Sequence, residues 1–146
     1  MIALVQRVLS ARVEVAGEVV GEIARGLLVL ICAEPTDGPA QAAKLVEKLL
    51  KLRIFNDEQG KMNRSLQDVQ GGLLLVSQFT LAADTSSGNR PSFTAAAHAA
   101  LGRELYDLVL RLARERHSLV QGGVFGADMQ VRLINDGPVT IPMKIA

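Results

Sequence analysis

Apolar and polar positions divide the first part of the chain into strand-like and helix-like stretches. Residues 2–23 alternate locally between apolar and charged side chains around Gly17, which predicts an antiparallel hairpin. Residues 26–34 form a nearly continuous apolar run, which is typical of a strand buried on both faces. Over residues 39–52 the apolar positions recur at helical spacing, so we expect an amphipathic helix there.

The rest of the chain predicts one more helix and four more strands. The helix covers residues 94–116, where leucines recur along one face. The other segments, in chain order, are a polar loop at 56–65, a strand at 72–81, a turn-rich loop at 82–92, and strands at 118–125, 128–136 and 138–145. We therefore expect a single domain over residues 1–146 with an α+β fold (α/β in some classification schemes). In this fold, mostly antiparallel strands form a partial barrel covered by two main helices.

Composition narrows the possible classes of function. The chain has 146 residues, of which 49% are hydrophobic and 21% charged, and these values are normal for a globular protein. A formal net charge of +1 provides no overall field that attracts a polyanion, so any contact with RNA must be local. Aromatic residues make up only 3%, too few for a row of stacking platforms along single-stranded nucleic acid.

The sequence contains no signal for a membrane, a metal or a cofactor. Its apolar runs are too short to span a membrane, and charged residues interrupt the N-terminal stretch where a signal peptide needs an apolar core. We therefore expect a cytoplasmic protein. Cys32 lies in an apolar run and is interpreted as a small buried hydrophobic residue. His98 and His117 form no local arrangement typical of a metal site or a triad, and no nucleotide-binding motif occurs.

Two segments place unusual residues within strand patterns. Ser77, Gln78 and Thr80 stand in a predicted strand, where buried polar groups need hydrogen-bond partners or a purpose. Gly137 and Pro138 interrupt another, although proline removes a ladder donor and glycine gives up side-chain packing. Taken alone, the first segment fits a polar strand end and the second a turn or an edge strand. Both also fit a binding site, because strand ends often carry binding residues and glycine lets the backbone approach a ligand.

The same two segments resemble the signature motifs of the D-aminoacyl-tRNA deacylases. They are SQFTL at 77–81 and NDGPVT at 135–140, and the similarity extends almost from end to end through MIALVQRV, RIFNDEQGKMN, NRPSF and GADMQV. The resemblance implies a carboxylic ester hydrolase that acts in proofreading during translation. Such an enzyme releases a D-amino acid, or glycine mischarged on tRNA(Ala), from the 3′ end of tRNA.

The resemblance also implies a homodimer that binds the acceptor end of aminoacyl-tRNA, with no role for DNA or a membrane. A Gly-cis-Pro motif, here Gly137 and Pro138, would reach from one subunit into the active site of the other. Rigid backbone at that point would clash with the side chain of an L-amino acid. It could not reject glycine, which has no side chain. Arg7 is implied as support of the motif, through hydrogen bonds to carbonyl groups.

The catalytic residues implied by the resemblance are Ser77, Gln78, Phe79 and Thr80. An aminoacyl ester is already activated, and the 2′-hydroxyl of the tRNA can help to orient or activate water. The protein then needs only to position the ester and stabilise the oxyanion, and backbone N–H groups around Gln78, Phe79 and Thr80 are the candidates. Covalent attack by Thr80 is the rival mechanism, although no residue is identified as its base.

Several alternatives stay open on the sequence alone. Phe125 and Met129 are implied beside the terminal adenosine of the tRNA, yet both also fit core positions. A non-catalytic oligomeric module that binds the acceptor end or a small ligand is the main alternative function, because no acid and base pair is identified. A related deacylase that tolerates L-alanine on the wrong tRNA is a nearer alternative, although SQFTL and NDGPVT resemble the D-specific version.

Overall fold

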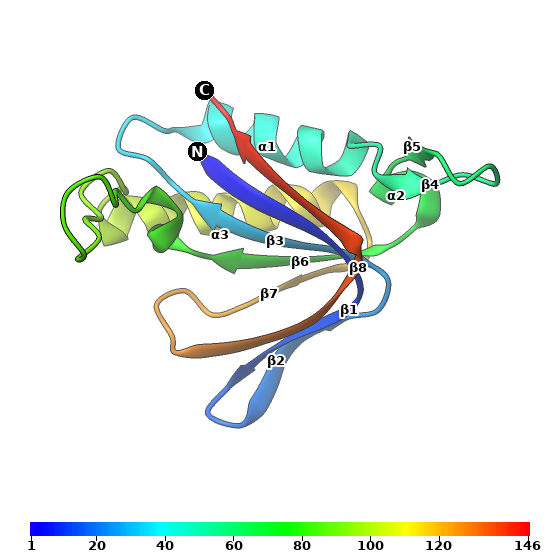
Figure 1. Ribbon diagram of the computed structural model, residues 1–146, viewed down its shortest axis with the longest axis horizontal. Coiled ribbons are helices and arrows are strands. Elements are labelled where there is room, and N and C mark those ends of the chain that lie inside the picture. Colours follow the sequence, from blue (N-terminus) through cyan, green and yellow to red (C-terminus); the bar gives the residue numbers. More distant parts are fainter.

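The computed structural model describes all residues, 1–146, as a curled β-sheet with helices packed on it (Figure 1). The strands are β1 (Ile2–Val15), β2 (Glu18–Ile23), β3 (Gly26–Cys32), β4 (Phe55–Asn56), β5 (Met62–Arg64), β6 (Gly72–Ser77), β7 (Val120–Gly122) and β8 (Met129–Lys144). The helices are α1 (Pro39–Lys51), α2 (Leu66–Val69), the 3-10 turn η1 (Phe79–Ala82) and α3 (Ala99–Arg116). None of these helices is long and apolar enough to cross a membrane.

The main sheet mixes antiparallel and parallel pairs. Its order is β2-β1-β3-β6-β7, with β8 also paired to β1, while β4 and β5 form a separate hairpin. β1 runs antiparallel to β2, β3 and β8, whereas β3 with β6 and β6 with β7 are parallel. The expected α+β fold, a partial barrel covered by two main helices, is confirmed. The parallel pairs were not predicted, because a strand buried on both faces gives the same apolar run whichever way its neighbour runs.

β1 and β8 are long strands that bend together. The first half of β1 lies between β3 and the end of β8, and the second half lies between β2 and the start of β8. Their register shifts on either side of Val8, and Figure 1 shows both strands turning sharply at the same place. Gly137 and Pro138 lie in this irregular stretch of β8. The segments predicted as two strands, 128–136 and 138–145, are therefore one bent strand.

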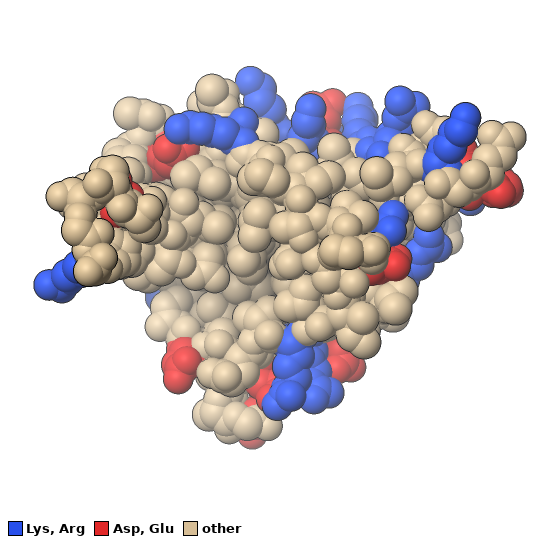
Figure 2. Space-filling model, viewed as in Figure 1, with Lys and Arg blue, Asp and Glu red and all other residues tan.

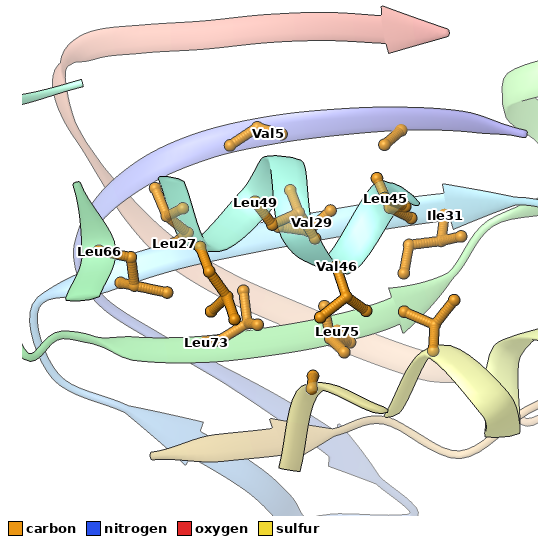
Figure 3. Packing of buried hydrophobic residues seen from close by; sticks show 14 of the residues in the cluster. Val5, Leu27, Val29, Ile31, Leu45, Val46, Leu49, Leu66, Leu73 and Leu75 are labelled. Atoms are coloured by element: carbon orange, nitrogen blue, oxygen red, sulfur yellow. The ribbon is translucent and has the colours of Figure 1, made fainter. Parts of the chain in front are cut away.

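The main hydrophobic core lies between the helices α1 and α3 and one face of the sheet (Figure 3). Alternate residues of β3 and β6 point toward the helices, and they are Leu27, Val29, Ile31, Leu73 and Leu75. α1, predicted over 39–52, packs on them with Leu45, Val46 and Leu49. A second cluster on the opposite face, which includes Leu28 and Leu74, fills the inside of the curl. β3 and β6 are therefore buried on both faces, as β3's apolar run predicted.

β3 and β6 lie in close contact at their first residues, Gly26 and Gly72. A Cβ atom at Gly26 would lie 1.9 Å from the carbonyl oxygen of Gly72, so only glycine fits there. From this point the two strands stay in register up to Ile31 and Ser77. The carboxyl ends of the two parallel strands consequently reach the same edge of the sheet.

The second main helix begins later than the sequence predicted. α3 starts at Ala99, and residues 94–98 are not helical. The backbone N–H of Ala97 donates to the carbonyl of Ala33 at the end of β3 (2.9 Å), and the side chain of His98 caps the helix. These contacts override the high helix propensity of the alanine run.

Three other boundaries differ from the predicted ones. β6 stops at Ser77 and continues as the turn η1, so the strand predicted over 72–81 is too long. The strand predicted over 118–125 is limited to the three residues of β7. The polar loop at 56–65 contains the β4–β5 hairpin, in which the carboxylate of Asp57 accepts hydrogen bonds from two backbone N–H groups. Local polar turns of this kind carry no apolar alternation that would reveal them.

Candidate active site

A cavity of about 620 Å³ opens at the carboxyl ends of β3 and β6. Its wall combines the ends of these strands with the loop before α3, the first turns of α3 and the segment before β8. Most lining residues are hydrophobic, and Asp128 is the only carboxylate among them. In the view of Figure 2, Lys and Arg side chains gather mainly along the upper and lower parts, and the surface between them is largely uncharged. A mainly apolar cavity with a few polar groups is the usual form of a small-ligand site.

The SQFTL segment forms one wall of this cavity. Ser77, Gln78 and Phe79 line it, whereas Thr80 does not. The backbone N–H of Gln78 donates to the carbonyl of Ile31 (2.7 Å), which fixes the segment to the end of β3. The side-chain amide of Gln78 donates to the hydroxyl of Thr80. Three of the four residues expected to be catalytic therefore meet at the cavity, and the fourth is connected to them by a hydrogen bond.

The turn after β6 leaves backbone donors next to the cavity. Phe79 and Thr80 are the first residues of η1, and the first N–H groups of a helical turn have no acceptor inside that turn. The N–H of Gln78, in contrast, is already bonded to β3. Of the three backbone donors considered from the sequence, two thus remain as candidates to bind an oxyanion.

Two aromatic rings lie at the rim of the cavity. The ring of Phe79 is 59% exposed and meets the ring of Phe93 edge to face, with 5.3 Å between the centroids. Both residues line the cavity. Exposed aromatic rings beside an opening offer a surface on which a planar ligand can pack.

Sequence reasoning missed most of the opposite wall. This wall is built from small residues around the start of α3, which are Ala96, Ala97, Ala99 and Gly102. They belong to the alanine-rich run that was predicted to be helix. Its small side chains leave the space that the cavity occupies, and the run TAAAHAALG was the only signal in the sequence.

Tyr106 and Cys32 also line the cavity, and both side chains are protonated at neutral pH. The hydroxyl of Tyr106 donates to the carbonyl of Leu75 (2.7 Å), and burial raises its pKa to about 12. Burial, together with the nearby charge of Glu34, raises the pKa of the Cys32 thiol. Both side chains therefore stay neutral. The interpretation of Cys32 as a small buried hydrophobic residue agrees with its 2% exposure.

Phe125 and Met129 lie in the cavity wall on the side of β8. Phe125 packs against Tyr106, with 6.2 Å between the ring centroids. The sulfur of Met129 would be 2.7 Å from a Cβ atom at Gly123, so the glycine allows the thioether to lie against the backbone there. Both residues are partly buried, pack against the hydrophobic clusters and also line the cavity.

Gly137 and Pro138 do not line the cavity of their own chain. They belong to β8 and lie beside Arg7 of the neighbouring strand β1. Arg7 is six residues from the cavity residue Met1, which corresponds to about 20 Å of strand. Both are exposed, and the peptide bond between them is cis. The structure therefore separates the NDGPVT segment from the SQFTL segment within one chain.

Arg7 holds the bend of β8 in place. It is 7% exposed, its Nε donates to the carbonyl of Asp136 (3.0 Å), and its Nη1 donates to the carbonyl of Ile54 (2.8 Å). The carboxylate of Asp136 lies 3.3 Å from the same Nε. One buried guanidinium thus connects β1, the loop before β4 and the residue that precedes Gly137.

The side chain of Asn135 braces the bend from within β8. Its amide oxygen accepts a hydrogen bond from the backbone N–H of Val139 (2.9 Å), and its amide nitrogen donates to the hydroxyl of Thr140 (2.7 Å). The side chain of Asn135, which precedes the exposed Gly-Pro segment, is thus bonded to the two residues that follow this segment.

No group of three or more His, Cys, Asp or Glu side chains comes together as metal ligands anywhere in the chain.

Comparison with known proteins places the chain in a family. The family model described as D-Tyr-tRNA(Tyr) deacylase matches residues 4–144. A D-aminoacyl-tRNA deacylase from Methylibium petroleiphilum is 66% identical over 145 residues, which cover 99% of this chain and 95% of that protein.

Two solved structures share the fold. One, named c-Myc DNA Unwinding Element Binding Protein, superimposes with a TM-score of 0.94 and is 41% identical, covering 100% of this chain and 99% of the other. The second, described as a probable eukaryotic D-amino acid tRNA deacylase, is 18% identical and has a TM-score of 0.84, with 97% of each chain covered. With the family model matching nearly the whole chain, this protein belongs to the D-Tyr-tRNA(Tyr) deacylase family.

Proposed function

We propose that this protein is a D-aminoacyl-tRNA deacylase, acting as one domain over residues 1–146, which hydrolyses the ester between a D-amino acid and the 3′ end of tRNA. The observation that carries the proposal is the SQFTL segment placed at the wall of an apolar cavity, in a chain 66% identical to a D-aminoacyl-tRNA deacylase. The cavity volume falls within the range of small-ligand sites, about 300–1,000 Å³, so it suits the aminoacylated end of the RNA.

The proposed reaction uses water as the nucleophile. Water adds to the ester carbonyl, the bond to the ribose 3′-oxygen breaks, and that oxygen leaves as the hydroxyl of free tRNA. The N–H groups of Phe79 and Thr80 stabilise the oxyanion, and one such donor is worth about 10²–10³ in rate. The 2′-hydroxyl of the substrate orients or activates the water. Tyr106 cannot act as the base near neutral pH, because its pKa is about 12.

Replacing Thr80 with alanine is expected to lower kcat by no more than about tenfold, because the backbone N–H that contributes to the oxyanion site remains. The hydroxyl accepts a hydrogen bond from Gln78, and Asp128, the one carboxylate of the cavity wall, makes no hydrogen bond with it. Single-turnover hydrolysis of D-tyrosyl-tRNA by Thr80→Ala measures the effect. Complete loss of turnover with unchanged tRNA binding would overturn the ranking of attack by water above attack by Thr80.

For chirality we propose that Gly137 and Pro138 enter the active site of a partner subunit in a homodimer. The distance from their own cavity and their exposure support an action in trans. Leu9 and Ile134, which flank the bend, are 52% and 56% exposed, and burying such apolar side chains would stabilise a dimer. The motif would reject L-amino acids by clash. It would accept glycine, so glycyl-tRNA(Ala) is a second expected substrate.

The test of the proposed function compares matched esters. Catalytic amounts of protein are mixed with D-tyrosyl-tRNA, L-tyrosyl-tRNA and glycyl-tRNA(Ala), and ester loss is followed above the protein-free rate. We expect rapid loss of the D and glycyl esters and persistence of the L ester. Loss of all three would leave a deacylase without chiral selection. Persistence of all three would favour a non-catalytic module that binds the acceptor end.

A further inference from the structure

Arg103 is a cation that lies at the cavity wall without a partner. It follows Gly102, a lining residue of α3, and its guanidinium carbon lies 4.9 Å from the centroid of the ring of Phe125, another lining residue. It is exposed and takes part in no ion pair or side-chain hydrogen bond of the chain. Arg111, two turns further along α3, is instead paired with Glu115 (3.3 Å).

The cavity wall offers no free cation to a phosphate, because the N-terminal ammonium of Met1 is already paired with Glu34 and Asp37. Sixteen of its 21 lining residues are hydrophobic, and none is Lys or Arg. A polynucleotide whose 3′ end enters this cavity carries phosphodiester charges, and placing them against an apolar wall would be costly. The first phosphodiester must therefore stay at the mouth, where a fixed cation can meet it.

We propose that Arg103 binds the phosphodiester that joins the terminal nucleoside of the substrate RNA to the preceding nucleotide. The inference rests on the proposed function, because it takes the aminoacylated end of an RNA as the occupant of the cavity. Arg103 is then a binding residue for the RNA chain and takes no part in the chemistry at the ester.

The geometry suits arginine for this role. A guanidinium is flat, so one face can rest on an aromatic ring while its N–H groups point outward and bind two phosphate oxygens at once. Resting on Phe125 limits the motion of the side chain, which lowers the entropic cost of binding. Asp128 is the one carboxylate in the wall, and it forms no ion pair with Arg103. The fork of N–H donors is therefore free.

The test uses two substrates that differ in the phosphate. D-Tyrosyl-tRNA carries the phosphodiester, whereas the D-tyrosyl ester of adenosine lacks it. For Arg103→Gln we expect kcat/KM on the tRNA to fall about tenfold, mainly through KM. The rate on the adenosine ester should not change. Arg103→Lys should keep part of the effect on the tRNA, because it retains the charge and loses the fork.

Arg111→Gln is the matched control, because it removes the same charge from the same helix at a distance of about 12 Å. It should leave both rates unchanged. The slope of log kcat/KM against log salt concentration on tRNA should also fall by about 0.7 for Arg103→Gln, the value for one contact to a single strand. Thermal midpoints of all variants check that the fold is kept.

Three results would overturn the proposal. An equal loss on both substrates would mean that Arg103 acts by packing Phe125, and no loss on either would mean that it does not meet the phosphate. Binding of an RNA oligonucleotide that ends in CCA and carries no aminoacyl group is measured in parallel, and equal affinity for wild type and Arg103→Gln would also reject the proposal. If the wild type hydrolyses neither ester, the proposed function fails, and the oligonucleotide measurement still decides whether Arg103 contacts RNA.

Discussion

Gly137→Ala is expected to lower the rate of D-tyrosyl-tRNA hydrolysis by about a hundredfold, because a displacement of about 1 Å at an active site is enough for such a loss. Gly137 has a φ of +135°, a conformation that residues with a side chain rarely adopt. An added Cβ would lie 2.8 Å from Cγ2 of Val139 and 3.3 Å from Nη2 of Arg7. The backbone of the bend must therefore move. Initial rates under kcat/KM conditions measure the loss.

Gly60→Ala is the control for the effect of backbone conformation alone. Gly60 also has a positive φ, +76°, but a Cβ there would meet nothing within 4 Å. This variant should lose about 1 kcal/mol of unfolding free energy and no activity. If Gly137→Ala hydrolysed D-tyrosyl-tRNA as fast as the wild type, the NDGPVT bend would have no part in the active site.

Mixing two inactive variants distinguishes action in trans from action in cis. Ala96→Trp places an indole in the cavity wall, so its own site is blocked while its Gly-Pro segment stays intact. In an equal mixture with Gly137→Ala, half of the dimers combine the two chains, and each of these holds one intact cavity next to one intact motif. Activity should then return to about one quarter of the wild-type value. If mixed dimers recovered no activity, the Gly-Pro motif would act in cis, on the cavity of its own chain.

The apolar pattern was sufficient to predict the fold class but not every connection. The hairpin of β1 and β2, the buried strand β3 and the helix α1 each carry a long periodic signal, and each was found where expected. β6 runs parallel to β3, and Gly26 meets Gly72 across this pair. Such a contact between distant residues leaves no local period.

The candidate site was predicted unevenly for a related reason. Polar residues in an apolar strand singled out Ser77 and Gln78, because a buried polar group is rare without a purpose. The facing wall at Ala96 and Ala97 contains only small apolar side chains, which fit a helix equally well by propensity. Its loop conformation depends on a hydrogen bond to Ala33, a residue more than sixty positions away in the chain. A cavity is a property of the packed fold, so local sequence patterns cannot define it.

Arg7→Met is expected to lower the unfolding free energy by about 3 kcal/mol, because it leaves one buried and one partly buried carbonyl group without their charged donor. These are the carbonyls of Asp136 and Ile54. Activity on D-tyrosyl-tRNA should fall as well, since the bend of β8 loses the contact that holds the residue before Gly137. Urea unfolding gives the stability, and kcat/KM measured well below the transition gives the activity of the folded fraction.

Arg132→Met and Arg7→Lys separate the causes of this loss. Arg132 lies on β8 too, but its side chain is 64% exposed and pairs only with Glu14, so its replacement should cost less than about 1 kcal/mol. Arg7→Lys keeps the charge. However, the two carbonyls are bound by different nitrogens of the planar guanidinium group, and the single ammonium of lysine cannot reach both. It should therefore recover part of the stability and less of the activity. Wild-type activity in Arg7→Met would mean that the position of the Gly-Pro segment does not depend on this arginine.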